Sequence, residues 1–511
     1  MRFYLFIIFY LLLPTKFYSQ SYAWAISDNT YNISHGLALD LDNNGNLFVA
    51  EPYAQSGLRL GVNIIKYDPN HNIIWKQKIE GKGFDGFSLA SDNMGNVCFL
   101  STFGDSLFVN GAYTDYCSAQ NVLLIRFSSF GAVQFVKHTT GTDMVRGRKV
   151  SIDNLNNIYV AGIFNGNVKF ENTLISSPVV YNYIAKYNSA GVLQWVKNTS
   201  GDGYCSFSGP GIGLETDASN NTYLAGTFSG TGYFGTYSIT ANANYAQNIY
   251  LAKMDPLGNW LWVKSAGGNN QDELYDLTLD KYGNPHITGF ISSTTAVFGI
   301  YTLTNGGGDD YFLAKYDSNG NVKWAINGGG PGTQWGMGIC VDNAGTSYIA
   351  RNSVCFSRFD SLGTYLGSEF QNANNYDMVS DSAGCVYITG DISSPVNFGA
   401  YGFTPTQSQQ MYIAKYCNSA IASNVSELKT EESFFIYPNP ANGKFIIKCS
   451  EESKVCSLSI KNSLGQIIYS EKHVTLTSTK EIDLDKQPKG IYFVELQDKS
   501  NKSIVKKIVL Q

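Results

Sequence analysis

Charged residues are scarce in this sequence. They make up 15% of its 511 positions, against about 25% in an average globular protein. The formal net charge is −5, and no block of Lys and Arg occurs, so we expect no nucleic-acid partner. Glycine and tyrosine are abundant instead, with 51 Gly and 34 Tyr. Few charges, many glycines for turns and many aromatics that favour strands predict an all-β chain.

Motifs of common enzymes are missing as well. The five His residues are scattered, none stands at zinc-ligand spacing, and neither a G-x-S-x-G elbow nor a P-loop occurs. One stretch, DLDNNGNLFVAE from Asp40 to Glu51, fits the pattern of a calcium loop. We expect Asp42 to Gly45 to be the turn of a hairpin instead. The sequence therefore identifies no catalytic residue, no metal ligand and no cofactor, while carboxylates gathered from distant positions stay an open alternative.

A long apolar run occurs only at the N-terminus. Phe3 to Leu13 is continuously apolar after Arg2, but these eleven residues are too few to span a bilayer, which takes about 20. We predict a secretory signal peptide over residues 1–20, with cleavage near Ser19 or Gln20. No later stretch reaches transmembrane length, so we expect export without a membrane-spanning segment.

A repeat becomes visible when the sequence is compared with itself. IDNLNNIYVAGIF at 152 returns as TDASNNTYLAGTF at 216 and LDKYGNPHITGFI at 279. Each copy predicts a hairpin, and a second hairpin such as NYIAKYNSAGVLQWVKN at 182 follows it after a variable excursion. Seven units of four strands result, and their turn residues are Asp42, Asp92, Asp153, Asp217, Asp280, Asp342 and Asp381.

The last unit lacks its fourth strand, which usually carries a Trp. It stops at MYIAKYCNSA at 411, whereas YAWAIS at 22–27 begins the exported chain with nothing in front of it to pair with. A ring explains both facts, because the N-terminal strand then completes the last sheet and leaves no unpaired edge. We predict a seven-bladed β-propeller over residues 21–418, with an open β-solenoid as the alternative.

The repeat resembles the secreted bacterial β-propeller repeat family, also called SBBP-like repeats. The resemblance rests on the D-x-x-G-N-x-Y-x-x-G hairpin, the F-G excursion and the A-K-Y-D-x-x-G-N-x-x-W hairpin, over roughly residues 21–418. The sixth unit departs from the pattern, since it lacks the excursion and has Arg351 in place of the repeat Gly. The resemblance implies a propeller scaffold and no single activity.

Side chains that recur in every unit are predicted to serve the fold. Besides the turn Asp residues, we expect pairing within each sheet from seven basic residues, namely Lys66, Arg126, Lys186, Lys253, Lys315, Arg358 and Lys415. Function is expected in segments that are not repeated, such as GDGYCSFSGPGIG with Tyr204 and Phe207, and GGGPGTQWGMG with Trp335. Because the sixth unit has lost its excursion, we expect a notch beside Trp335 in which aromatic side chains bind a glycan or a peptide. The alternative is that Trp335 belongs to the core.

The C-terminal segment has a different composition, and its fraction of charged residues roughly doubles after residue 426. We predict a linker over 419–432 and a small immunoglobulin-like β-sandwich over 433–511. The segment closely resembles the C-terminal sorting domain of type IX secretion cargo from the Bacteroidetes. The residues that carry the resemblance and are expected to form the sorting signal are Pro438, Asn439, Pro440, Gly443, Gly465, Gly490, Tyr492, Lys506 and Lys507.

This resemblance implies partners and a location. It implies export across the inner membrane, recognition by the type IX machinery at the outer membrane, and then release or attachment to surface lipopolysaccharide. The alternative is an ordinary immunoglobulin-like tail without a sorting role.

The nine Cys residues are odd in number. Export permits disulfides, but the cysteines of the repeats fall at unequal positions and suggest no pairing. In KFIIKCSEESKVCSLSI, a hairpin centred between Glu452 and Ser453 would place Cys449 opposite Cys456, close to the reach of a disulfide. The alternative is that both thiols are unpaired.

Three functions fit the sequence. The leading one is a secreted or surface-displayed binding or adhesion protein, and the others are an extracellular polysaccharide hydrolase or lyase and a structural surface-layer component. A cluster of acids in the central channel would favour an enzyme, whereas a channel lined by backbone, Gly, Ser and Asn would favour a binding protein.

Overall fold

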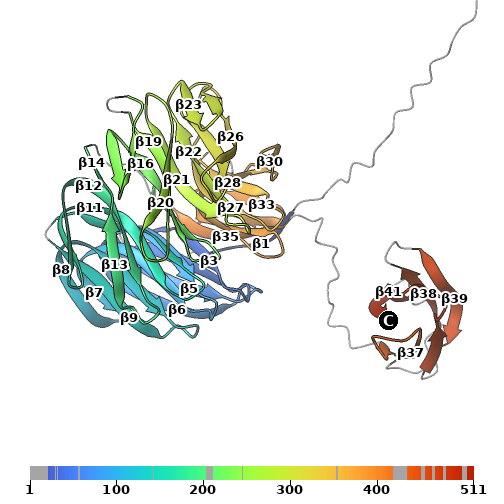
Figure 1. Ribbon diagram of the computed structural model, residues 1–511. Coiled ribbons are helices and arrows are strands. Elements are labelled where there is room, and N and C mark those ends of the chain that lie inside the picture. The colour runs from blue at the N-terminus through green and yellow to red at the C-terminus, as the bar shows by residue number, and fades with distance from the viewer. Residues whose placement is uncertain are drawn as a thin grey trace, which may run out of the picture. The chain divides into compact units, whose positions relative to one another are not determined.

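The computed structural model divides the chain into two units, residues 1–422 and 423–511. It describes residues 21–28, 30–31, 33–55, 58–141, 143–202, 211–243, 246–352, 355–417, 434–449, 455–462, 466–475, 479–497 and 503–511. Both units are all-β, and the described residues contain no helix (Figure 1). The predicted signal peptide and linker lie outside the described residues.

The larger unit repeats a four-stranded antiparallel sheet. Three sheets follow the chain in order, each formed from two hairpins. They are β15 (Gly213–Thr216), β16 (Thr222–Phe228), β19 (Asn248–Met254), β20 (Trp260–Ala266); β21 (Asp272–Leu279), β22 (Pro285–Ile291), β25 (Asp310–Tyr316), β26 (Val322–Gly328); and β27 (Gly336–Val341), β28 (Ser347–Arg351), β29 (Phe356–Phe359), β30 (Tyr365–Glu369).

Toward the N-terminus the same pattern runs on without a break, because the strand β6 serves two successive repeats. Its first half pairs with β5 and its second half with β7. The continuous sheet contains β2 (Ile33–Ser34), β3 (Ala38–Leu41), β4 (Leu47–Gln55), β5 (Leu58–Tyr67), β6 (Ile73–Ser91), β7 (Val97–Val109), β8 (Ala112–Phe127), β9 (Val133–Gly141), β10 (Val145–Ile152), β11 (Ile158–Phe170), β12 (Thr173–Tyr187) and β13 (Leu193–Asn198).

The N-terminal strand completes the last repeat, as the sequence predicts. One sheet consists of β1 (Ser21–Ser27), β35 (Gln410–Cys417), β32 (Cys385–Ile392) and β31 (Asn374–Ser380). The antiparallel register of β1 and β35 sets Trp24 opposite Lys415 and Ser27 opposite Tyr412. The Trp24 ring also lies 5.1 Å from the ring of His71, which belongs to the first repeat. The strand therefore joins the end of the repeat array to its beginning.

The excursions between second and third strands form small hairpins in several repeats. They comprise β17 (Thr231–Phe234) and β18 (Tyr237–Thr240); β23 (Thr295–Phe298) and β24 (Tyr301–Thr304); and β33 (Val396–Phe398) and β34 (Tyr401–Phe403). β14 (Ser200–Gly201), in the connection from the third repeat to the fourth, pairs with β17. In the sixth repeat only residues 352–355 separate β28 from β29. The predicted loss of the excursion is thus confirmed.

Strands inside the repeats are apolar on both faces, because each sheet is covered on both sides. Every residue of β16, β19 and β22 is buried. A strand with only one covered face would instead alternate between apolar and polar residues. This burial agrees with the low charge of the sequence.

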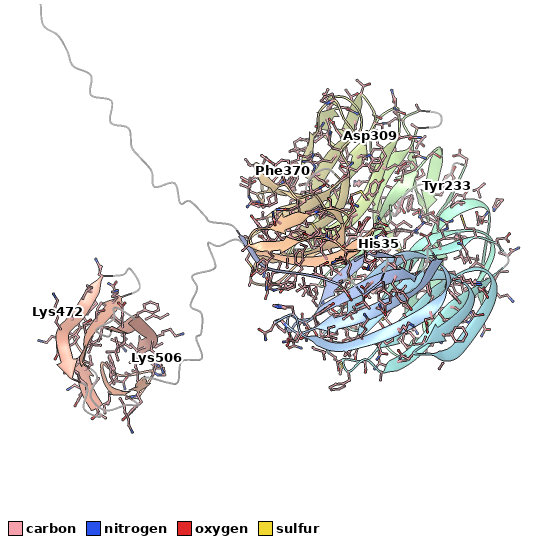
Figure 2. All side chains as sticks on the ribbon, turned by 180° about the vertical axis from the view of Figure 1, so that it is seen from behind. His35, Tyr233, Asp309, Phe370, Lys472 and Lys506 are labelled. Atoms are coloured by element: carbon pink, nitrogen blue, oxygen red, sulfur yellow. A yellow bond between two sulfur atoms is a disulfide. The ribbon has the colours of Figure 1, made fainter. Side chains whose placement is uncertain are left out.

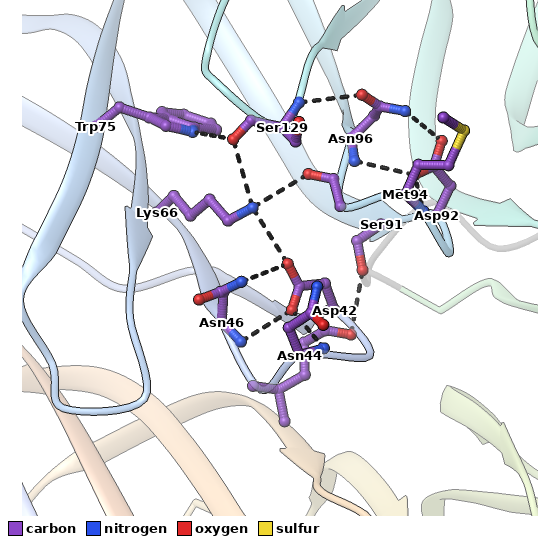
Figure 3. Close-up of polar contacts among 12 residues, drawn as sticks. Asp42, Asn44, Asn46, Lys66, Trp75, Ser91, Asp92, Met94, Asn96 and Ser129 are labelled. Atoms are coloured by element: carbon purple, nitrogen blue, oxygen red, sulfur yellow. Dashed lines mark hydrogen bonds and ion pairs between the residues drawn. The ribbon is translucent and has the colours of Figure 1, made fainter.

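The predicted turn is present at Asp42. The amides of Asn44 and Asn46 donate to Asp42 Oδ1, each at 2.9 Å, and the Asn46 side chain donates to Oδ2 at 2.8 Å (Figure 3). Gly45 has a φ of +76°, and Asn156 takes this left-handed conformation in another repeat, with φ +61°. Residues 40–51 therefore form two strands and a tight turn, as expected, and not the loop between two helices that an EF-hand requires.

The smaller unit contains two antiparallel sheets. One is β36 (Phe434–Tyr437), β37 (Lys444–Cys449) and β40 (Thr479–Asp483), and the other is β39 (Ile467–Thr475), β38 (Val455–Asn462), β41 (Gly490–Gln497) and β42 (Ser503–Leu510). Buried side chains from both sheets, among them Phe445, Ile460 and Val494, form one core. The two-sheet arrangement agrees with the predicted sandwich.

The predicted hairpin between Cys449 and Cys456 is wrong. β37 pairs with β36 and β40, whereas β38 pairs with β39 and β41, so these consecutive strands belong to different sheets. Cys449 stands opposite Phe434, and Cys456 opposite Val474. Alternating strands with a short connection occur both in hairpins and in crossings between sheets. The side chains of both cysteines lie outside the described residues.

Candidate functional site

The recurring polar residues stabilise the scaffold. Lys66 Nζ lies 3.1 Å from Asp42 Oδ2, and both side chains are buried (Figure 3). The predicted pairing of the turn Asp with a basic residue is confirmed in five repeats, by Lys66–Asp42, Arg126–Asp92, Lys253–Asp217, Lys315–Asp280 and Lys415–Asp381. In the other two repeats the basic group faces a ring, Lys186 that of Tyr159 and Arg358 that of Tyr416.

The same basic residues also join one repeat to the next. Lys66 Nζ donates to the carbonyl of Ser129 in the following repeat at 3.5 Å, and Trp75 Nε1 donates to the same oxygen at 3.0 Å (Figure 3). Equivalent bonds recur as Lys186 to Pro256, Lys253 to Ser318 and Trp324 to Ser361. The recurring Lys and Trp are thereby explained by contacts between sheets.

A cavity of about 690 Å³ lies at the centre of the larger unit. Its walls are the first strands of the repeats, β3, β6, β10, β15, β21, β27 and β31. Each of these strands contacts the next, and β31 contacts β3, so that they form a continuous ring. Side chains from sites far apart in the sequence therefore face one another here.

Five carboxylates and three cations line this cavity. The acids are Asp40, Asp85, Glu215, Asp276 and Asp377, and the cations are Lys149, Arg146 and Arg148. Asp85 Oδ2 lies 3.3 Å from Arg146 Nη1 and 3.3 Å from Arg148 Nη1. Lys149 Nζ lies 2.8 Å from Asp276 Oδ1. The other carboxylate oxygen of Asp276 accepts the amide of Ile339 at 3.1 Å.

Two more of these acids bind backbone amides of the neighbouring repeat. Asp377 Oδ2 accepts the amide of Leu39 at 2.8 Å, and Asp40 accepts the amide of Ser91. Ser88 does the same without charge, since its hydroxyl accepts the amide of Val150 at 3.1 Å. Asp40, Asp276 and Asp377 thus contribute to the joints between sheets, whereas no hydrogen bond within the described part of the chain involves the Glu215 carboxylate.

Burial in the cavity raises the pKa of three of these acids. Removal from bulk water raises the pKa of Glu215 to about 8, and the neighbouring acids add to the effect while Lys149 opposes it. Burial likewise raises the pKa of Asp40 to about 6 and that of Asp377 to about 6. For Lys149 burial acts in the opposite sense, but Asp276 and Asp377 outweigh it and raise the pKa. The cavity therefore takes up protons near neutral pH.

The rim position, which lines the cavity in six of the seven repeats, carries six different residue types. It lies five residues before the turn Asp and is occupied by Leu37, Phe87, Arg148, Ile212, Tyr275, Met337 and Tyr376. The position two residues later is apolar throughout, with Leu39, Leu89, Val150, Leu214, Leu277, Ile339 and Met378. An apolar residue at one position and varied residues at the rim position two residues earlier are typical of a scaffold that carries a specific site.

Trp335 packs against this rim through Tyr275. Its ring is half-buried, stacks on Tyr275 with centroids 6.2 Å apart, and lies 5.7 Å from the Phe290 ring. Its Nε1 donates to Asp309 Oδ2 at 3.0 Å, and its backbone amide donates to Asn352 Oδ1 at 3.0 Å. The structure thus gives Trp335 both a packing role and access to solvent. Figure 2 labels Asp309 in the larger unit.

The other predicted aromatics, Tyr204 and Phe207, lie outside the described residues. Among the described residues no group of three or more His, Cys, Asp and Glu side chains is placed to share a metal ion. In that same part of the chain, no helix has the length and hydropathy to cross a membrane.

A disulfide joins Cys385 in β32 to Cys417 in β35. The sequence left the pairing of cysteines within the repeats open. The two residues stand opposite each other in the ladder, and Cys417 also faces Ser21 of β1. The bond therefore ties the strand that holds the N-terminus to the rest of its sheet. Cys98, Cys340 and Cys355 are free and buried.

Several residues of the predicted sorting signal hold the last strand of the smaller unit. The Asn439 side chain donates to the carbonyl of Lys507 at 2.8 Å and accepts the amide of Val509 at 3.0 Å. Tyr492 is buried, and its hydroxyl donates to the carbonyl of Pro488 at 2.6 Å. Asn439 lies between Pro438 and Pro440, so this motif is fixed against β42.

The remaining predicted residues of this signal have varied surroundings. Gly443 has a φ of +76°, and a Cβ atom there would lie 1.9 Å from Asp485 Oδ1, so only glycine fits. Gly490 begins β41, and Lys506 lies within β42. Gly465 lies outside the described residues.

Comparison with known proteins identifies the smaller unit. Residues 435–511 match the family described as "Secretion system C-terminal sorting domain". This domain indicates export through the type IX secretion system of the Bacteroidetes, followed by secretion or attachment to the cell surface. It also implies an interaction with the secretion machinery.

The rest of the chain has more distant relatives. It is 26% identical over 377 residues to an uncharacterized WD repeat-containing protein of Acanthamoeba polyphaga mimivirus, a match that takes in 61% of this chain and 23% of that protein. The chain thus spans less than a quarter of that relative's length.

Among solved structures, BamB from Moraxella catarrhalis is 10% identical, with 78% of this chain and 99% of that chain covered and a TM-score of 0.40. PorZ, a surface component of the type IX secretion system of Porphyromonas gingivalis, is 11% identical, with 95% and 100% covered and a TM-score of 0.23. Neither likeness contributes to the assignment of function.

Proposed function

We propose that the larger unit is a seven-bladed β-propeller, closed by β1, that binds a ligand outside the cell after type IX export. The ring of contacts among the first strands and the pairing of β1 with β35 support the closed propeller. We also propose that the repeats are members of the SBBP-like family that they resemble. The ligand site is the rim of the central cavity on the side of Trp335.

One observation carries the binding role. The rim position five residues before each turn Asp carries six residue types in seven repeats, while the positions that hold the scaffold recur. The cavity lining includes the aromatic rings of Tyr275, on which Trp335 stacks, and Tyr376, together with the cations of Arg146 and Arg148. Aromatic faces and a few oriented polar groups in a concave site are what ligand recognition requires.

The test is binding of the full chain to a panel of extracellular polysaccharides and matrix proteins, scored for both retention and product release. We expect retention without product, and loss of retention in Trp335→Ala. Because Trp335 packs on Tyr275 and Phe290, this substitution will also lower stability, so Trp335→Phe serves as a second variant with the packing kept. Phe130→Ala, at a ring that is 88% exposed on another repeat, is the control. Unchanged retention in both Trp335 variants would contradict the site.

A polysaccharide hydrolase or lyase is the second candidate, and the acids of the cavity favour it. Glu215, with a pKa of about 8, holds a proton at neutral pH that it could donate to a leaving group. Of the other four acids, Asp40, Asp276 and Asp377 accept backbone amides and Asp85 pairs with Arg146 and Arg148, so each already has a partner other than a substrate. Release of oligosaccharide by the native chain, lost in Glu215→Gln, would replace the binding role by catalysis.

A further inference from the structure

A groove opens where the sixth repeat has lost its excursion. It follows residues 370–373, the connection from β30 to β31, and the first residue of β31, Asn374. An outer hollow of about 440 Å³ lies between Phe370–Asn372 and Pro395–Asn397. An inner hollow of about 170 Å³ shares Gln371 and Asn372 with it and reaches Asn352 and Asp391.

The short connection between β28 and β29 makes this space. Only residues 352–355 join these strands, whereas β33 and β34 extend the equivalent connection of the seventh repeat, and Pro395, Val396 and Asn397 line the opposite side. Asn352 also accepts the amide of Trp335. Asn352 therefore links the groove to the loop of Trp335, beside which the sequence predicts a notch.

The lining of the groove is rich in side-chain amides with fixed orientation. Asn372 Nδ2 donates to Ser394 Oγ at 2.7 Å, and Asn374 Nδ2 donates to Asp391 Oδ2 at 3.2 Å. Each amide has two donor hydrogens and an acceptor oxygen, so these bonds leave further groups for a ligand. Preorganised amides bind a ligand with little additional loss of side-chain entropy.

Charge and apolar surface in the groove narrow the class of ligand. The lining holds no Lys or Arg, and its single carboxylate, Asp391, is fully buried and lies 3.3 Å from His35 Nδ1. At the outer end the Phe370 ring is 71% exposed and stands at the surface of the unit (Figure 2). Neutral hydroxyl groups suit such amides, and an apolar sugar face suits such a ring.

We propose that this groove binds a neutral glycan. The proposal rests on the binding role proposed above and names the class of ligand. Hydroxyl pairs of the sugar bond to Gln371, Asn372 and Asn374, and one sugar ring packs on Phe370. An anionic polysaccharide would meet no cation among the described residues that line this groove. A peptide strand would meet amide side chains instead of an exposed strand edge with unpaired backbone groups.

The experiment uses the full chain on an array of neutral and acidic oligosaccharides, followed by affinity electrophoresis in the neutral polysaccharide that the array selects. The variants are Phe370→Ala and Asn372→Ala, both at exposed positions. Leu362→Ala, at a side chain that is 78% exposed on the turn of the same repeat, is the matched control. We expect about tenfold weaker binding in each groove variant, equivalent to about 1.4 kcal/mol, and no change in the control.

The outcomes are distinct. Binding to acidic glycans alone, binding to none, or equal affinity in the groove variants and the control would overturn the glycan groove. If Trp335→Ala and Trp335→Phe abolish retention while Phe370→Ala and Asn372→Ala retain the ligand, the result supports the proposed function and contradicts the glycan groove. If the groove variants lose binding and the Trp335 variants keep it, the groove stands and the rim site falls.

Discussion

Truncation of Tyr22 in the N-terminal strand should strongly destabilise the larger unit. The Tyr22 side chain is 7% exposed, and its ring lies 5.3 Å from Phe398 and 5.4 Å from Tyr416. Its hydroxyl donates to Cys355 Sγ at 3.5 Å. These contacts link residues more than 300 positions apart, so they form only if the ends of the repeat array meet.

The expected magnitude follows from the burial. Replacing a buried aromatic side chain with alanine costs about 3–5 kcal/mol, because apolar contacts are lost and a cavity remains. Tyr22→Phe keeps the ring and should cost only about 1 kcal/mol, the worth of one hydrogen bond. Ala23→Ser changes an exposed residue of the same strand and should alter the free energy of unfolding by less than about 0.5 kcal/mol.

The assay is urea unfolding of the full chain followed by tryptophan fluorescence. All seven Trp residues precede residue 423, so the signal reports the larger unit alone. We expect the midpoint to fall in the order Ala23→Ser, Tyr22→Phe, Tyr22→Ala. If Tyr22→Ala unfolds at the same urea concentration as Ala23→Ser, the N-terminal strand is not part of the cooperative unit and the reasoning is refuted.

Three further predictions concern charge and covalent links. Lys66→Met leaves the buried carboxylate of Asp42 unpaired and should lower the free energy of unfolding by about 3–5 kcal/mol in the same assay. The control Lys82→Ala, at a side chain that is 79% exposed, should have almost no effect. Equal effects of the two substitutions would contradict a stabilising role of the buried Lys66–Asp42 pair. The pKa of Glu215, raised to about 8, means that the folded chain binds more protons than the unfolded chain between about pH 4.5 and 8, so stability falls as pH rises through this window. Glu215→Gln should therefore raise the melting temperature relative to the native chain at pH 9 and not at pH 4, and an equal shift at both values would argue against a buried carboxyl. Replacing Cys385 and Cys417 together with Ser should lower the free energy of unfolding by about 2–4 kcal/mol, and reduction of the native chain should reproduce the loss; an unchanged midpoint would show that the bond is not formed.

Much of the scaffold could be predicted because it is repeated. The missing Trp strand in the last repeat predicted the pairing of β1 with β35, and the recurrence of Lys66 and its equivalents predicted the buried ion pairs. Their contact with the following repeat, through Ser129 and its equivalents, was not predicted, since a repeat pattern shows which residues matter and not which neighbour they touch.

The candidate site could be predicted only in part. Trp335 and its notch follow from departures within one repeat, but Asp40, Glu215, Asp276 and Asp377 belong to four repeats and meet only in the ring. Their sequence signal was a place in the first strand, two residues before the turn Asp for Asp40 and Glu215 and four residues before it for Asp276 and Asp377.

The disulfide between Cys385 and Cys417 could also have been predicted from the sequence. Extending the register of β32 and β35 by two rows from Lys415 opposite Tyr387 sets Cys417 opposite Cys385. The hairpin expected at Cys449 failed for another reason, because local alternation cannot distinguish a hairpin from a crossing between two sheets.

Amide hydrogen exchange of residues 22–27 tests the central claim most directly. In the full chain, the ladder with β35 should protect the amides of this strand as strongly as those of β35 itself, since both open only when the closing sheet opens. Exchange of residues 22–27 at the rate of an unstructured peptide, with β35 still protected, would contradict closure of the ring by the N-terminal strand.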